Sequence, residues 1–338
     1  MKFDRFVKYL AVGQIHNEFI IDLNGKAVND LIGGPVVYTA ASINYWGGTV
    51  GLISGVGRSF QETWKSELEK KRLDTRGIRL LPDDLDLRTF YAHISPKICL
   101  RDNPVAVYSA RGLPFPKGLL GFSYSENESN FPMLQDLSKT LLTDLPSEYL
   151  DAIAAHISPI DLGCQIQMST LLLKGSVRTL TIQPHPSYMN PTNWDDFAIL
   201  VKDSTAIITR ESELRALFQG RSTEIWEMME CVASFGCSFV IVDESPRGFY
   251  LFDASNSTRF HVPRYPGRLL DPTGEIDSFC GGFLVGFQSH YDPLRSVVQG
   301  SASASITIEN TGPFSINDCL PGLEQSRMQV IESMTTRV

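Results

Sequence analysis

The amino-acid sequence predicts an α/β fold with a largely parallel central sheet covered by helices on both faces. Apolar runs of strand length alternate with helical patterns through most of the chain, and this alternation is typical of parallel sheets. At 338 residues the chain can bury a substantial core, as one large domain or two smaller ones. In sheets of this kind ligands bind at the carboxyl ends of the strands.

The predicted elements follow from apolar periodicity and from the glycines that interrupt it. In the N-terminal part, strands are predicted at residues 7–15, 19–23, 49–56 and 77–81, and helices at 35–46 and 61–72, the first of which stops at Gly47 and Gly48. Further on, strands are predicted at 179–183, 205–209 and 239–243, followed by a hairpin of 248–252 and 259–262. The helices predicted there are 193–201, 211–218, 223–235, 278–288 and 294–306.

Residues 87 to about 149 break this alternation. The segment is rich in proline, serine, asparagine and aromatic residues, and connections of such length are usually functional lids or disordered segments. Aromatic side chains there are expected to cover a ligand or to form a contact between two copies of the chain.

Composition excludes several classes of function. The net charge of −8 argues against a sequence-independent nucleic-acid binder, and the apolar runs are too short to span a membrane. The N-terminus lacks the apolar core of a signal peptide. Six scattered cysteines without a C-x-x-C pair indicate buried free thiols in a reducing compartment. We therefore expect a cytoplasmic protein without nucleic-acid or membrane partners.

The most informative segment is residues 271–287. A turn of small residues ends at Asp277, and an apolar helix containing several glycines follows at once. The backbone N–H groups of Gly274 to Asp277 and the N-terminus of that helix would converge on one point, which favours an anion. The Asp277 carboxylate would stand beside it, where a general base for phosphoryl transfer is needed. A plain helix N-cap is the alternative for this aspartate.

This segment resembles the signature D-T-x-G-A-G-D-x-F of the ribokinase-like (PfkB) carbohydrate and nucleoside kinases. It matches at Asp271, Thr273, Gly274, Asp277 and Phe279 and departs at two positions, Glu275 and Ile276. A β-branched isoleucine resists positive φ, and Glu275 adds a negative charge beside a phosphate. Both departures are expected to weaken the anion site, with Arg210 and Arg247 as candidate sources of compensating charge.

The substrate-side motifs of the family also have counterparts. The pattern G-x-I-x-x-D corresponds to residues 13–18 and puts Glu18, with Asn17 beside it, at the position that contacts substrate hydroxyls. The Gly-Gly loop corresponds to Gly33 and Gly34, with Tyr38 in place of an asparagine. Residues 48–57 resemble the strand that follows in the family. Of the histidines His16, His93, His185 and His261, only His185 is expected to face the cleft.

The nucleotide-side motifs are less well preserved. The family's N-x-x-E becomes Arg210 to Glu213, and its T-x-G-x-x-G turn becomes Asp243 to Gly248, with Ser245 at the middle glycine. The small residues 300–305, including Ser303, match the helix that borders the adenine.

The resemblance implies a ribokinase-like three-layer α/β/α sandwich with a small β-lid. It implies a single domain over residues 1–338, with the lid formed by about 14–34 and 87–149, and a homodimer paired through that lid. It further implies that ATP phosphorylates a hydroxyl of a small polar substrate, a sugar, nucleoside or cyclitol, and that Asp277 is the base.

The same resemblance assigns a role to each candidate residue. Substrate contacts fall to Glu18, Asn17, Gly33, Gly34 and Tyr38, and nucleotide contacts to Arg210, Glu213, Asp243, Gly248 and Ser303. Mg²⁺ would be held through water by Glu213, and a monovalent cation such as K⁺ by Asp271 and Thr273. Two alternatives stay open: a non-catalytic ligand-binding or scaffolding protein on this fold, and a kinase with another phosphoryl donor.

Overall fold

The structure is a computed structural model that describes residues 6–81, 85–124 and 145–338. Its main feature is a ten-stranded sheet with the order β14-β13-β12-β11-β10-β9-β8-β1-β4-β5. The strands are β1 (Tyr9–Val12), β4 (Val50–Val56), β5 (Asp74–Leu80), β8 (Ala154–Ile157), β9 (Thr179–Ile182), β10 (Ala206–Arg210), β11 (Phe239–Asp243), β12 (Gly248–Asp253), β13 (Thr258–Pro263) and β14 (Thr336–Arg337). All pairs from β5 to β11 are parallel, and β12 to β14 extend the sheet in antiparallel fashion.

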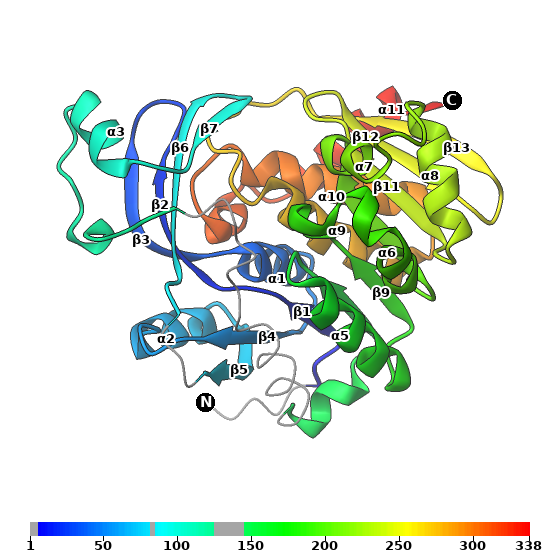
Figure 1. The fold of residues 1–338 in the computed structure, drawn as a ribbon, viewed down its shortest axis with the longest axis horizontal. Helices are drawn as coiled ribbons and strands as arrows, with labels where there is room; N and C mark the ends of the chain where they lie inside the picture. The colour runs from blue at the N-terminus through cyan, green and yellow to red at the C-terminus, as the bar shows by residue number, and fades with distance from the viewer. Residues whose placement is uncertain (1–5, 82–84, 125–144) are drawn as a thin grey trace.

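Helices cover both faces of this sheet, as predicted (Figure 1). One face carries α5 (Leu162–Lys174), α6 (Trp194–Val201), α7 (Glu211–Leu217) and α8 (Ile225–Ser234). The other carries α1 (Pro35–Tyr45), α2 (Glu62–Lys70), α9 (Glu275–His290), α10 (Pro293–Thr307) and α11 (Leu323–Met334). Central strands such as β1 and β4 are buried along their whole length, which explains why they form continuous apolar runs in the sequence.

Helix α9 is buried almost throughout, and glycines let its neighbours approach closely. A Cβ at Gly282 would lie 2.2 Å from Ser303 Oγ in α10, and one at Gly281 would lie 2.4 Å from the Thr39 carbonyl oxygen in α1. Since α9 is clamped between α1 and α10, its N-terminal turn has a defined position at the edge of the large sheet.

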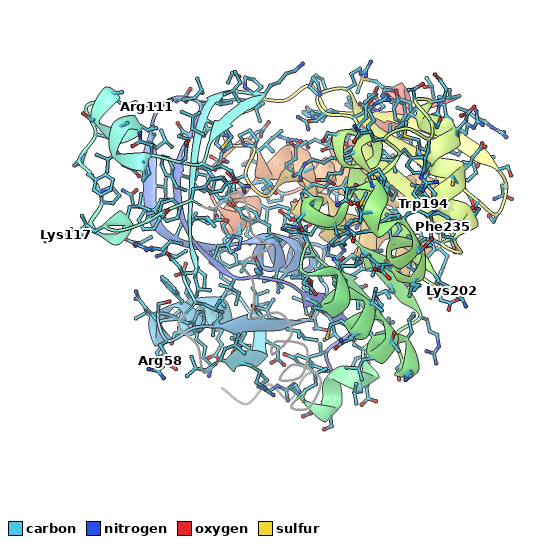
Figure 2. The ribbon with its side chains drawn as sticks, viewed as in Figure 1. Arg58, Arg111, Lys117, Trp194, Lys202 and Phe235 are labelled. Atoms are coloured by element: carbon cyan, nitrogen blue, oxygen red, sulfur yellow. The ribbon has the colours of Figure 1, made fainter. Side chains whose placement is uncertain are left out.

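A second, four-stranded sheet has the order β3-β2-β6-β7. It is formed by β2 (His16–Ile21), β3 (Ala27–Gly33), β6 (Arg88–Ser95) and β7 (Ile98–Leu100). One face has a core of its own, which includes Phe19, Phe90 and Tyr108, and α3 (Pro104–Ala110) packs there. Figure 1 shows α3 on the outer side of this sheet, and Arg111 and Lys117 in Figure 2 lie on that side as well.

The two sheets agree with the predicted architecture, and most predicted elements are found within a few residues of their expected bounds. The segment after residue 87 contains regular structure that the sequence did not predict, namely β6, β7 and α3. The rest of the predicted lid segment, residues 125–144, lies outside the described residues. Strand β8 and helices α5 and α11 were also not predicted.

Two further expectations can be checked on the described residues. All six cysteines are free, but only Cys164, Cys237 and Cys280 are buried as expected. Cys99, on the edge strand β7, is exposed, and Cys231 and Cys319 are half-buried. Within the described ranges, none of the helices has both the length and the hydropathy needed to cross a bilayer.

Candidate active site

A cavity of about 380 Å³ lies where the small sheet faces the carboxyl edge of the large one. Segments far apart in the sequence contribute to it: the chain after β1, strands β2 and β6, the start of α1, the loop after β9, and the turn before α9. Three charged residues of the predicted site line it: Glu18, Arg210 and Asp277. The lining also includes other polar and aromatic residues, namely His16, Tyr38, Tyr91, His93, Arg101 and His185. This is the location that a parallel sheet favours for a ligand.

Asp277 lies in the first turn of α9. The helix begins at Glu275 with Gly274 as its N-cap, so Asp277 is the third helical residue and not the N-cap. Thr39 donates a hydrogen bond of 3.0 Å to the Asp277 backbone carbonyl, which fixes the turn against α1. The carboxylate is buried, and its Oδ1 has no hydrogen-bond partner within the described residues. Burial raises the pKa of Asp277 to about 6, although the nearby Arg210 guanidinium lowers it.

The backbone turn before Asp277 differs from the expectation. Gly274 has a φ of 74°, and a Cβ there would lie 2.1 Å from the Tyr38 ring, so the position requires glycine. Ile276 is the second residue of α9 and is not among the described residues with positive φ. Its side chain is buried in the apolar cluster of Phe279 and Phe283. The turn therefore requires no positive φ at this position, and the expected weakening of the anion site by Ile276 stays a prediction.

Glu275 also has a partner that the sequence did not suggest. Its carboxylate forms an ion pair with Arg264, and both side chains are largely buried. Of the two predicted sources of compensating charge, Arg247 pairs with Glu244 instead. Arg210 contacts Glu213, but its positive charge also acts on Glu275 and lowers the pKa of that carboxyl group. Burial raises the pKa of Glu275 to about 7, and Arg264 opposes that rise.

A second cavity, of about 320 Å³, adjoins the first and shares Arg210 and Pro272 with it. Asp243, Ser245 and Glu275 line it. Arg210 ends β10 beside Asp243 at the end of β11, with which it pairs in parallel register. A guanidinium at this junction can contact an anion in the second cavity while facing Asp277 in the first.

Three residues predicted for the nucleotide side line neither cavity. Glu213 is buried and caps α7, because its carboxylate accepts hydrogen bonds from Thr209 Oγ1 at 2.8 Å and from the Arg210 N–H at 3.0 Å. Gly248 has a φ of 131° and lies against the β13 backbone. Ser303 is buried between α9, α10 and α1, where it accepts a hydrogen bond of 2.7 Å from Trp46 Nε1.

On the substrate side, Glu18 is fully buried and both of its oxygens accept hydrogen bonds. The Gly34 N–H donates to Oε1 at 2.8 Å, and the Tyr38 hydroxyl donates to Oε2 at 3.0 Å. A Cβ at Gly33 would lie 2.2 Å from Glu18 Oε2, which explains the first glycine of the pair. Burial raises the pKa of Glu18 to about 8, although these two hydrogen bonds lower it.

Strand alternation separates Asn17 from the other predicted substrate residues. His16 and Glu18 line the cavity, whereas Asn17 points to the opposite face of β2, where its Nδ2 lies 3.4 Å from Asp30 Oδ1. The expectation that His185 alone faces the cleft is also wrong, because His16 and His93 line the cavity too.

His93 connects the small sheet to the turn that precedes α9. Its Nε2 lies 2.9 Å from Thr273 Oγ1 and 3.2 Å from Asp271 Oδ1, the two residues predicted to hold a monovalent cation. Burial lowers the pKa of His93, but hydrogen bonds and charge interactions with Asp271 and Cys99 outweigh it and raise the value to about 9. A positively charged imidazole therefore already contacts this pair near neutral pH.

The sequence did not single out His16, His93, Arg101 or Arg264 as site residues, whereas Tyr91 is one of the aromatic residues expected to cover a ligand, and it lines the cavity. His16, His93 and Arg101 belong to the small sheet or directly follow it, in a region where few elements were predicted. The alternation of Tyr91 and His93 along an apolar strand is a period-two signal that could have placed both on one face. Arg264 carries no comparable local signal.

The chain is similar in sequence and in fold to known kinases. Residues 181–318 match the family model of the pfkB family carbohydrate kinases. The chain is 25% identical to the cytidine kinase of Thermococcus kodakarensis over 308 residues, which cover 91% of this chain and 98% of that protein.

Solved structures share the fold over nearly the whole chain. A putative ribokinase II from E. coli in complex with ATP and Mg²⁺ superimposes with a TM-score of 0.68 at 17% identity, covering 96% of this chain and 99% of its own. A nucleoside kinase from Burkholderia thailandensis in complex with ADP-inosine gives a TM-score of 0.71 at 14% identity, with 96% of each chain covered. The family match thus covers residues 181–318, and the ribokinase-like fold is shared over nearly the whole chain.

Proposed function

We propose that this protein is a kinase that transfers the terminal phosphoryl group of ATP to a hydroxyl group of a small polar substrate, with Asp277 as the general base. The observation that carries the proposal is the Asp277 carboxylate, which is buried at the cavity with one oxygen that has no partner within the described residues. A pKa of about 6 keeps this group ionised at neutral pH and close to the value at which a base is most effective.

The reaction needs the substrate hydroxyl and the phosphate to meet at the start of α9. The hydroxyl would occupy the larger cavity beside Asp277, and the N–H groups of the first turn of α9 would bind the transferring phosphoryl group. Arg210 supports this arrangement because it borders both cavities. Its positive charge would stabilise the charge that develops between donor and acceptor.

Mg²⁺ would be bound mainly by phosphate oxygens. Within the described part of the chain, no group of three or more His, Cys, Asp or Glu side chains could hold a metal ion. Mg²⁺ in kinases commonly uses one or two carboxylates together with phosphates and water, and Asp243 in the second cavity fits that requirement. Bound Mg²⁺ would neutralise charge on the phosphates. The Glu213 carboxylate instead caps α7.

A monovalent cation is a further proposal, in which Asp271 would be the ligand. Asp271 Oδ2 is buried without a partner within the described residues, which suits a cation. The Thr273 hydroxyl does not fit as a second ligand, since His93 already contacts it.

Nucleosides are the substrates to test first, because the chain resembles a cytidine kinase over 91% of its length. We expect Mg²⁺-ATP-dependent phosphorylation of at least one compound in a panel of cytidine, inosine, ribose and a cyclitol. Asp277→Asn should lower kcat by about 10²-fold or more, the usual contribution of a general base, while the Kd for ATP stays within about threefold. Product formation by mass spectrometry and calorimetric ATP binding measure the two quantities.

Thr39→Val serves as the matched control, because it removes the contact to the Asp277 backbone but keeps the carboxylate. It should lower kcat far less than Asp277→Asn does. If Asp277→Asn turns over at the wild-type rate, the base is another group.

A further inference from the structure

Arg264 belongs to none of the family motifs found in the sequence, yet it contacts the turn where phosphoryl transfer is proposed. It directly follows β13, and its guanidinium forms an ion pair with Glu275 in the first turn of α9. The two side chains are only 14% and 11% exposed. Glu275 is one of the two departures from the family signature. The negative charge that it adds at this position is paired with the positive charge of Arg264.

The same guanidinium reaches the opposite wall of the second cavity. Arg264 Nη2 donates a hydrogen bond of 2.6 Å to Ser245 Oγ, in the turn after β11. The backbone N–H of Arg264 donates to the Arg247 carbonyl oxygen at 3.2 Å. Ser245 and Glu275 both line the cavity of about 320 Å³, whereas Arg264 itself stands behind it. One buried side chain thus links the two walls between which a nucleotide phosphate would lie.

Charge balance explains why this link matters for an anion. Asp243, Glu244 and Glu275 line the cavity, and an unpaired carboxylate in the first turn of α9 would repel a phosphate group at close range. Breaking a buried ion pair leaves such an uncompensated charge. Arg264 does not line the cavity, and its guanidinium neutralises the charge of Glu275 from outside it. The N–H groups of the turn therefore stay available to an anion.

We propose that Arg264 is a positioning residue of the phosphoryl-donor site, which neutralises Glu275 and holds the first turn of α9 against the 243–248 turn. This inference rests on the proposed function, since it concerns the same nucleotide site. It predicts that a glutamate at position 275 is compatible with nucleotide binding only when Arg264 pairs with it.

The test is a double-mutant cycle on Mg²⁺-ATP affinity, measured by calorimetry on the full chain. Arg264→Gln should weaken binding by about tenfold or more, because couplings between contacting charges commonly reach this size. Glu275→Gln should bind as well as the wild type or more tightly. The double variant should return to within about threefold of the wild type, although it has lost the same arginine.

Arg327 provides the matched control. It forms a comparably buried ion pair with Glu309, and neither residue lines a described cavity. Arg327→Gln should lower the midpoint of urea unfolding but leave the Kd for ATP unchanged. Urea unfolding of every variant without nucleotide establishes that each one is folded at the temperature of the binding measurement.

Failure of this inference differs from failure of the proposed function. If the wild type binds Mg²⁺-ATP and Arg264→Gln binds it equally well, the role of Arg264 is wrong and the kinase proposal stands. If Arg264→Gln is weakened but the double variant is weakened equally, Arg264 acts without Glu275 and the inference is again overturned. If the wild type itself does not bind Mg²⁺-ATP, both proposals fail.

Discussion

Glu18 and Asp277 are two buried carboxyl groups in one cavity with different surroundings. Both oxygens of Glu18 accept hydrogen bonds, from Gly34 and Tyr38. Asp277 keeps one oxygen without a partner within the described residues. Glu18 is therefore suited to hold the Gly-Gly turn and the Tyr38 ring in place, and Asp277 is suited to accept a proton.

The raised pKa of Glu18 predicts a pH dependence of stability. Its usual value is 4.5 and its folded value is about 8, so between these pH values the folded state keeps a proton that the unfolded state releases. The stabilisation is complete below the unfolded pKa and is lost as pH rises towards the folded pKa, with a slope of at most about 1.4 kcal/mol per pH unit. Glu18→Gln should flatten this decline in urea unfolding between pH 5 and 8.

Asp277 and Glu275 also have raised pKa values. Part of the decline in unfolding free energy with pH should therefore persist in Glu18→Gln. Glu67→Gln, at an exposed position in α2, is the control and should leave the curve unchanged. An identical slope in wild type and Glu18→Gln would contradict the expectation.

At the scale of elements, the site depends on how α9 packs. Its apolar residues are buried on all sides, so the helix is held by α1, α10 and the sheet together. Its N-terminal turn carries Asp277 and the N–H groups proposed to bind phosphate. Any change that separates α9 from α10 therefore acts on the site from a distance.

Gly282→Ala tests this dependence. The added Cβ would lie 2.2 Å from Ser303 Oγ and 3.1 Å from the Gln299 carbonyl oxygen, so the Ser303 side chain must rotate away from Trp46 or α9 and α10 must move apart. We expect a loss of about 1–3 kcal/mol from overpacking, which exceeds the gain of about 1 kcal/mol in helix propensity, and a lower kcat. Urea unfolding and the kinase assay measure the two effects.

Gly163→Ala in α5 is the corresponding control, because its Cβ would meet only the end of the Asp161 side chain. Its stability should change little and its kcat not at all. A Gly282→Ala protein as stable as the wild type would show that α9 and α10 adapt without cost.

For the whole molecule, ligand binding should appear as thermal stabilisation. Mg²⁺-ATP at about one hundred times its Kd would add roughly 2.7 kcal/mol, and each kcal/mol raises the Tm by about 2–4 °C in domains of 150–250 residues. We expect a shift of several degrees in a thermal-shift titration, larger with K⁺ than with choline if Asp271 binds a cation. No shift at millimolar ATP would argue for another phosphoryl donor.

The arrangement of the two sheets shows what the sequence could predict. Strands such as β4 and β11 are continuous apolar runs of strand length, and helices such as α1 and α9 are apolar stretches of helical length. The turn before Asp277 has a local motif, so these elements and the turn were found. Strands β6 and β7 were missed because β6 is partly exposed and β7 is both exposed and only three residues long. Pairing through the small sheet remains a prediction.

The sequence by itself determined the fold class, the position of Asp277 at the start of a helix, and the glycines that a close approach requires. These features depend on neighbouring residues and on periodicity within single elements. Only the tertiary structure decided that His93 reaches Asp271, that Arg264 neutralises Glu275, and that Asn17, Glu213 and Ser303 lie away from the cavities. Such contacts join residues up to 180 positions apart, and they depend on side-chain directions that are set only when the sheets and helices pack together.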